Sequence, residues 1–164
     1  MHNPEEILRP FVTSGMTVLD IGSAMGFFTL PLAKIVGPSG KVVSVDVQEK
    51  MLQSLQRRAL KARVLDRIIT RVCKPTSLCL DGLDGTIDFA LAFAVVHEVH
   101  DVSKLFADLF PSLKYGAKCL IAEPKGHVSA HDFELTLSIG EQAGLRVAGK
   151  PKITLCHAAL LNKD

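Results

Sequence analysis

The sequence predicts a doubly wound, mostly parallel α/β sheet of seven strands, with an antiparallel strand near the C-terminus and helices on both faces in three α/β/α layers. Three observations support this fold class. Short β-branched runs alternate with amphipathic segments along the chain. Residues 87–96 are apolar on both faces, with an unbroken apolar run from 89 to 96, which is typical of a central parallel strand that is covered on both sides. Residues 18–29 join an apolar run to a helical pattern through a turn of small residues.

The first strand–helix unit occupies residues 4–40. Residues 4–12 have apolar side chains at helical spacing behind Pro4, and they predict a short amphipathic helix that lies over a ligand or the sheet edge. Residues 17–21 are the first strand. Residues 27–36 are apolar on most faces, which favours a helix buried against the sheet, and the turn sequence Gly-Pro-Ser-Gly ends this helix.

Two further strands and the helix between them follow. Residues 41–45 are a β-branched run and predict the second strand. Residues 48–62 carry apolar side chains along one helical face and basic side chains on the other, which indicates a helix with a solvated outer surface. Residues 68–73 are the third strand, and residues 74–86 form a loop.

The alternation continues in the second half of the chain. Residues 87–96 predict the fourth strand and residues 102–113 a helix, after which a turn is expected at 115–116. Residues 119–122 are the fifth strand. Residues 129–144 begin with a capping-box pattern and predict another helix.

Two short strands, at residues 146–148 and 153–161, complete the sheet. No repeat, low-complexity tract or long linker interrupts the chain. We therefore interpret residues 1–164 as a single domain, which is long enough to bury a sizeable core.

The composition argues against several classes of partner. The 19 Lys and Arg residues nearly balance the 17 Asp and Glu residues, and there is no Trp and one Tyr, so no surface for nucleic acid is indicated. No apolar run is long enough to cross a membrane. The four cysteines show neither a disulfide framework nor zinc spacing, which predicts no metal site and a reducing, cytoplasmic location. The high apolar content is also compatible with a homodimer.

The turn after the first strand is suited to close contact with a ligand. Gly22, Ala24 and Gly26 alternate, so the backbone amides at the start of the next helix are nearly free of side chains. A dinucleotide site needs the spacing G-x-G-x-x-G, and counting from Gly22 places Phe27 at the third glycine position. The spacing therefore disfavours a nicotinamide-dependent oxidoreductase.

The pattern Asp20-x-Gly22-x-Ala24-x-Gly26 resembles motif I of the class I S-adenosylmethionine-dependent methyltransferases, which have a Rossmann-like fold. Segments 42–46, 88–99 and 113–117 are similar to the second strand, the fourth strand and the approach to the fifth strand of that family. The resemblance is strongest to the methyltransferases of ubiquinone and menaquinone biosynthesis. It implies S-adenosylmethionine as the cofactor and methyl transfer as the reaction.

The chemistry of S-adenosylmethionine predicts which residues contact it. The cofactor has an amino-acid end, a ribose and an adenine, so it needs a turn of small residues, an acceptor at the sugar and an apolar slot. Asp46 follows the second strand and supplies a carboxylate that can accept both ribose hydroxyl protons. The predicted cofactor-binding residues are Asp20, Gly22, Ser23, Ala24, Gly26, Asp46, Val47, Met51, Cys73, Lys74 and Phe93.

Two positions depart from the family pattern. Ala24 replaces the middle glycine, which is acceptable if its φ is negative. After the third strand, many relatives have an acidic residue that bonds the adenine amino group, whereas this chain has Cys-Lys-Pro-Thr-Ser at 73–77. We expect Thr76 or a backbone group to take that role.

His97 and Glu98 are the predicted catalytic residues. Methyl transfer from a sulfonium is an in-line displacement that depends mainly on alignment, and a general base is needed only if the acceptor must lose a proton. Both residues follow the fourth strand, where an acceptor would lie. Other polar side chains expected at this sheet edge are those of His100, Glu123, Lys125 and His127. His97 and His100 are three residues apart rather than four, which does not match the H-E-x-x-H zinc pattern.

The sequence thus predicts a methyltransferase that acts on a small-molecule acceptor. The main alternative is a non-catalytic S-adenosylmethionine-binding subunit or sensor, because few residues are left over for recognising a substrate. The weaker alternative is the nicotinamide-dependent oxidoreductase.

Overall fold

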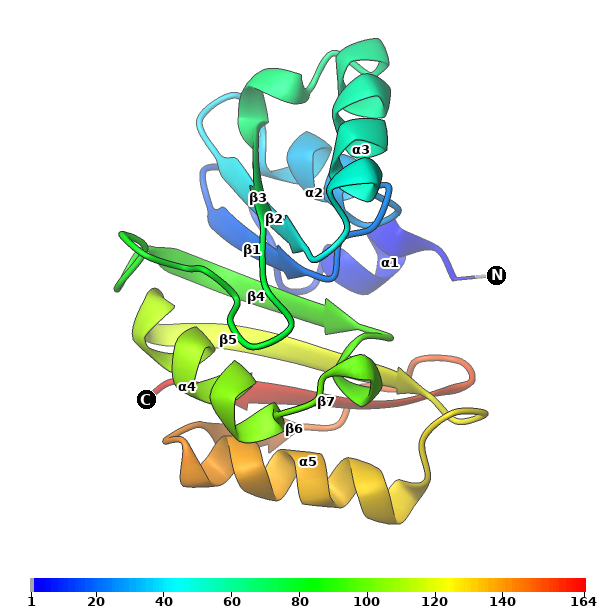
Figure 1. Ribbon diagram of the computed structural model, residues 1–164, viewed down its shortest axis with the longest axis vertical. Coiled ribbons are helices and arrows are strands. Elements are labelled where there is room, and N and C mark those ends of the chain that lie inside the picture. Colours follow the sequence, from blue (N-terminus) through cyan, green and yellow to red (C-terminus); the bar gives the residue numbers. More distant parts are fainter. Residues whose placement is uncertain (1) are drawn as a thin grey trace.

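The computed structural model describes residues 2–164 and is organised around one seven-stranded sheet (Figure 1). Its strands are β1 (Thr17–Ile21), β2 (Lys41–Asp46), β3 (Ile68–Val72), β4 (Ile87–Phe93), β5 (Leu113–Pro124), β6 (Arg146–Gly149) and β7 (Cys156–Asn162). The strand order is β3-β2-β1-β4-β5-β7-β6. All neighbours are parallel except that β7 runs antiparallel to both β5 and β6. The predicted fold class is confirmed.

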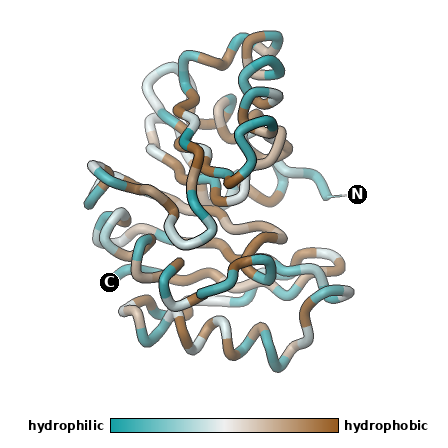
Figure 2. Tube along the Cα trace, viewed as in Figure 1, coloured by the Kyte–Doolittle hydropathy of each residue, from teal (hydrophilic) through white to brown (hydrophobic). Residues whose placement is uncertain are grey.

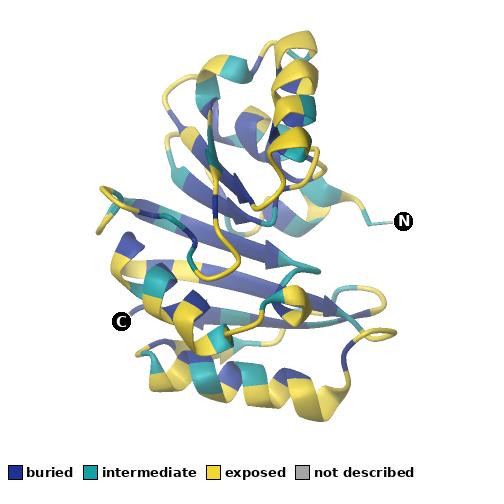
Figure 3. Ribbon diagram, viewed as in Figure 1, coloured by how far each residue is buried: buried dark blue, intermediate teal, exposed yellow. Residues whose placement is uncertain are grey.

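Helices cover both faces of the sheet. They are α1 (Pro4–Leu8), α2 (Thr29–Val36), α3 (Glu49–Lys61), α4 (Val102–Ser112) and α5 (Ala130–Gln142), with short 3₁₀ helices η1 (Leu65–Arg67) and η2 (Val96–Glu98). Val18 of β1 belongs to an apolar cluster that includes residues of α1, α2 and α3, whereas its neighbour Leu19 belongs to a second cluster that includes residues of α4 and α5. The strands are therefore apolar on both sides, and they form the buried, hydrophobic centre of the molecule (Figures 2 and 3).

The N-terminal helix is shorter than predicted and lies elsewhere. α1 ends at Leu8, because Pro10 has no amide hydrogen with which to continue the helix. Leu8 and Val12 belong to the same apolar cluster as Val18 of β1, and α1 contacts α2. The N-terminal segment thus lies beside α2 over the central strands β1 and β4, where Phe11 stacks on Phe89, and the expected position over a ligand or the sheet edge is wrong.

The predicted turn at 115–116 lies inside a strand. β5 begins at Leu113, and its register against β4 shifts between the pairs Ile87–Leu113 and Phe89–Lys118. The extra residues form a bulge in which Gly116 has a φ of +82°. The fifth strand is also longer than the apolar run 119–122 at its C-terminal end, because pairing with β7 continues as far as Pro124.

Among residues 2–164, no helix combines the length and apolar character needed to cross a membrane.

Candidate functional site

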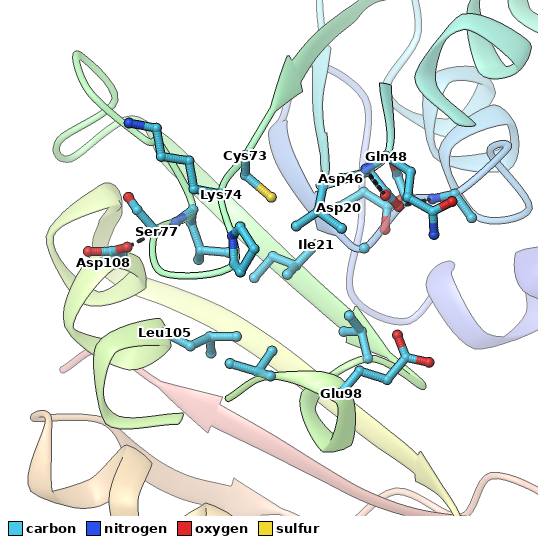
Figure 4. A pocket seen from close by; sticks show the side chains of 18 of the residues that line it. Asp20, Ile21, Asp46, Gln48, Cys73, Lys74, Ser77, Glu98, Leu105 and Asp108 are labelled. Atoms are coloured by element: carbon cyan, nitrogen blue, oxygen red, sulfur yellow. Dashed lines mark hydrogen bonds between the residues drawn. The ribbon is translucent and has the colours of Figure 1, made fainter. Parts of the chain in front are cut away.

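A cavity of about 550 Å³ opens at the carboxyl ends of β1, β2, β3 and β4 (Figure 4). β1 lies between β2 and β4, so the strand order reverses at this point, which is where open α/β sheets bind ligands. The volume is within the range of small-molecule sites. Six segments form the walls: the turn after β1, the end of β2, the start of α3, the loop after β3, the turn after β4 and α4.

The turn after β1 brings bare backbone to the cavity. Gly22 (φ +68°) and Ser23 both donate their amide hydrogens to the Val45 carbonyl, at 2.9 and 3.1 Å, and this fixes the turn to β2. A Cβ atom on Gly22 would lie 2.4 Å from Cγ2 of Val95, so only glycine fits. The Ser23 hydroxyl is buried beside the cavity and has no hydrogen-bond partner within residues 2–164. A polar group of a ligand at this turn would satisfy it.

Ala24 adopts the left-handed conformation, with a φ of +48°, so the negative φ under which an alanine would be free of strain is not what the structure has. Its amide donates to Oδ2 of Asp46 at 2.9 Å, and this bond holds the residue in that conformation. The left-handed region costs an L-residue about 1–2 kcal/mol. The turn therefore holds an alanine in a conformation that glycine adopts more readily, at some expense in stability.

Replacing Ala24 by glycine is expected to raise the free energy of unfolding by about 0.5–1 kcal/mol. Glycine adopts this φ without strain, although it gives the unfolded chain more freedom. Urea unfolding measures the change. Ala107→Gly, at an exposed position in α4, is the matched control and should lower stability by about 1 kcal/mol. A loss of stability in Ala24→Gly would show that the alanine is not strained.

Asp46 ends β2 with a buried carboxylate that is held from two sides. Oδ2 accepts from the Ala24 amide at 2.9 Å, and Oδ1 accepts from the Gln48 amide at 2.8 Å. Each oxygen keeps a second lone pair. The carboxylate lines the cavity, so it can accept two further hydrogen bonds, such as those of a vicinal diol.

Asp20 is a second buried carboxylate at the end of β1. It is 3% exposed and accepts from the Thr29 hydroxyl at 2.6 Å, and that hydroxyl lies 3.0 Å from Ser44 Oγ. Burial raises the pKa of Asp20 to about 7; the Thr29 hydrogen bond opposes this shift and the negative charge of Asp46 adds to it. A cationic group in the cavity would favour the ionised form.

The remaining predicted cofactor residues line the cavity on the side of β2, β3 and β4. They are Val47, Met51, Cys73, Lys74 and Phe93. Burial, with smaller contributions from Asp46 and Cys79, raises the pKa of the Cys73 thiol to about 11. The thiol is therefore neutral near pH 7 and acts as an apolar wall rather than a nucleophile.

The sequence reasoning missed the contribution of α4. Lys74 and Ser77 exchange backbone hydrogen bonds, which closes a tight hairpin at the cavity, and Asp108 of α4 accepts from the Leu78 amide at 2.9 Å. Leu105 and Asp108 thereby become part of the lining (Figure 4). No local signal identifies them, because the loop joins α4 only through contacts about 30 residues apart in the chain.

Two predicted site residues lie outside the cavity lining. Gly26 (φ +92°) faces α3, where an added Cβ would lie 2.2 Å from Cδ1 of Leu55, so its lack of a side chain serves helix packing. His97 turns away from the cavity and bonds Glu123 through Nδ1. Glu98 does line the cavity, as does His100, whereas Lys125 and His127 do not. Within residues 2–164, no group of three His, Cys, Asp or Glu side chains is placed to hold a metal ion.

Known proteins share this sequence pattern and fold. Residues 12–150 match a family model described as a methyltransferase domain. The ubiquinone/menaquinone biosynthesis C-methyltransferase UbiE of Pasteurella multocida is 28% identical over 112 residues, which cover 68% of this chain and 41% of that protein. The chain thus spans less than half the length of this curated relative.

Two solved structures are similar over nearly the whole chain. A SAM-dependent methyltransferase from Aquifex aeolicus is 28% identical with a TM-score of 0.87, covering 99% of this chain and 90% of that one. The cyclase SpnF is 16% identical with a TM-score of 0.76, covering 90% of this chain and 58% of that one, and it shares the fold alone. Since the family model spans most of the sequence and the motif I turn ends β1 as in a doubly wound sheet, this chain belongs to the methyltransferase domain family.

Proposed function

We propose that this protein binds S-adenosylmethionine in the cavity and transfers its methyl group to a small-molecule acceptor. The observation that carries the proposal is the Asp46 carboxylate beside the turn at Gly22. Two backbone amides orient this carboxylate, and its free lone pairs suit the two hydroxyls of a ribose. The family membership and the likeness to the methyltransferase from Aquifex aeolicus support the same cofactor.

The residues around the cavity fit each part of the cofactor. The bare backbone at Gly22 and the unpartnered Ser23 hydroxyl suit the polar amino-acid end. The buried carboxylate of Asp20 suits its positive charge. Val47 and Met51 offer an apolar wall to the adenine, and Thr76 at the tip of the hairpin offers a hydroxyl with which its amino group could bond. When bound, S-adenosylmethionine supplies a methyl group activated by its sulfonium.

Glu98 is the acceptor-side candidate for a general base. Its side chain lines the cavity beyond the turn after β4 and is 72% exposed, so an acceptor can reach it (Figure 4). A base within hydrogen-bond reach of the acceptor would remove its proton before or during transfer. Alignment of the two reactants supplies most of the acceleration.

Calorimetric titration tests the cofactor assignment. We expect S-adenosylhomocysteine and S-adenosylmethionine to bind and NAD not to bind. Affinity for NAD without affinity for S-adenosylhomocysteine would favour the nicotinamide-dependent oxidoreductase and overturn the proposal.

Transfer needs a separate test, because the same fold occurs in a cyclase. The protein is incubated with S-adenosylmethionine labelled on the methyl group and a pool of small metabolites, and label is sought in the small molecules. Label transferred above a control with the Asp46→Ala variant supports the enzyme. Tight cofactor binding with no transfer to any metabolite would favour the non-catalytic subunit or sensor.

A further inference from the structure

A buried carboxylate outside the cavity accepts hydrogen bonds from the turn that follows β4. Glu123, near the end of β5, is 2% exposed. Its Oε1 accepts from the amides of Val95 at 3.1 Å and Val96 at 2.8 Å, while Oε2 bonds Nδ1 of His97. A buried charge needs such partners, and here two of the three belong to the backbone of one turn.

The turn needs this support because of how the two strands end. The last β4 residue to pair with β5 is Phe93, opposite Ala122. Ala94 then leaves the sheet in the left-handed conformation, with a φ of +55°. β5 continues beside β7, so its next residue, Glu123, reaches the amides that β4 leaves without strand partners. Without the carboxylate, both amides would lose their hydrogen-bond acceptor, and the bond to the Val96 amide is buried.

This turn also forms part of the wall of the cofactor cavity. Ala94 and Val95 line it, whereas Glu123 and His97 do not. The Val95 side chain also lies directly against Gly22, because a Cβ atom added to Gly22 would lie 2.4 Å from Cγ2 of Val95. A chain of contacts thus joins Glu123 to Val95 and Val95 to the motif I turn.

We propose that Glu123 is a positioning residue that holds the turn 94–97 in the shape the cofactor requires. The inference rests on the proposed function, and it concerns a residue that does not touch the cavity. His97 completes the hydrogen bonding of the carboxylate, which replaces the general-base role predicted for it. Cofactor affinity therefore depends on the acceptor oxygen of residue 123 more than on the imidazole.

Binding of S-adenosylhomocysteine by four variants tests the proposal. Glu123→Leu removes the acceptor and is expected to weaken binding at least about tenfold. Glu123→Gln keeps an oxygen for the amides of Val95 and Val96 and should stay within about threefold of the wild type, as should His97→Phe. Leu161→Ala is the control, since it opens the core on β7 away from the cavity and should lower stability without changing affinity.

Each result decides the assignment. Wild-type affinity in Glu123→Leu, or equal losses in Leu161→Ala and Glu123→Leu, would overturn it, and so would a loss in His97→Phe as large as that in Glu123→Leu. If Glu123→Leu does not fold, Glu123→Asp replaces it; the shorter side chain should weaken binding about three- to tenfold, and wild-type affinity would again overturn the proposal.

Hydrogen exchange separates this inference from the proposed function. The Val95 and Val96 amides should exchange slowly in the wild type and Glu123→Gln, and rapidly in Glu123→Leu or Glu123→Asp. A wild type that binds no S-adenosylhomocysteine would overturn the proposed function, and the exchange rates would still decide whether Glu123 holds the turn.

Discussion

Asp20→Asn is expected to raise the free energy of unfolding of the ligand-free protein by about 2–4 kcal/mol at pH 8. Burial raises the pKa of Asp20 from 3.8 to about 7, and each pKa unit corresponds to about 1.4 kcal/mol. At pH 8 the folded state must hold a charge that water would solvate better. Asparagine removes the charge and still offers an oxygen to the Thr29 hydroxyl.

The pH dependence of stability gives the sign of this effect. Well below pH 4 the carboxyl group is protonated in both the folded and the unfolded state. Between pH 4 and 7 the folded state retains the proton that the unfolded state has lost, so the contribution of Asp20 to stability falls as the pH rises and levels off above pH 7. Asp20→Asn should lack this fall.

Urea unfolding at pH 5 and pH 8 measures both predictions. Asp84→Asn, at an exposed position in the loop before β4, is the matched control and should change stability little at either pH. If Asp20→Asn were no more stable than the wild type at pH 8, the carboxylate would not be strained by burial.

The same substitution should weaken cofactor binding. The carboxylate of Asp20 lines the cavity, and its charge is the feature that a cationic amino-acid end would use. A variant that is more stable and binds S-adenosylhomocysteine less tightly would show that the protein retains a destabilising charge for binding. For the wild type, affinity should decrease below pH 7 as Asp20 takes up its proton.

Asp46→Ala is expected to weaken S-adenosylhomocysteine binding by about 1.5–3 kcal/mol, or roughly 10- to 150-fold. The substitution removes the charge-assisted acceptor for the ribose and frees the amides of Ala24 and Gln48. Calorimetry measures the affinity. Glu49→Ala, an exposed acidic neighbour outside the cavity lining, should bind as the wild type does. Unchanged affinity in Asp46→Ala would remove Asp46 from the site.

The local pattern of the sequence contained most of the secondary structure. β1 matches its predicted bounds, and α3 and α5 lie within two residues of theirs, because apolar periodicity and capping residues act over short distances. The exceptions have local physical causes that periodicity does not reveal. Pro10 ends α1 early, and Gly116 allows a bulge where a turn was expected.

The local pattern likewise identified some features of the candidate site and left others to the tertiary structure. The spacing of Gly22, Ala24 and Asp46 predicted residues that the structure brings together around one cavity. The same spacing could not distinguish Gly22, which faces Val95 and the cavity, from Gly26, which packs against α3. The two glycines of one motif thus have different roles. Gly22 leaves room for Val95 beside the cavity, whereas Gly26 leaves room for Leu55 of α3.

By itself, the sequence determined the α/β fold class, the turn of small residues and the carboxylate after the second strand, because each depends on neighbours close in the chain. Only the tertiary structure decided that Ala24 is left-handed, that α4 closes the cavity and that His97 faces Glu123 rather than an acceptor. Those features depend on hydrogen bonds between segments 22 to 30 residues apart, whose geometry no local pattern encodes.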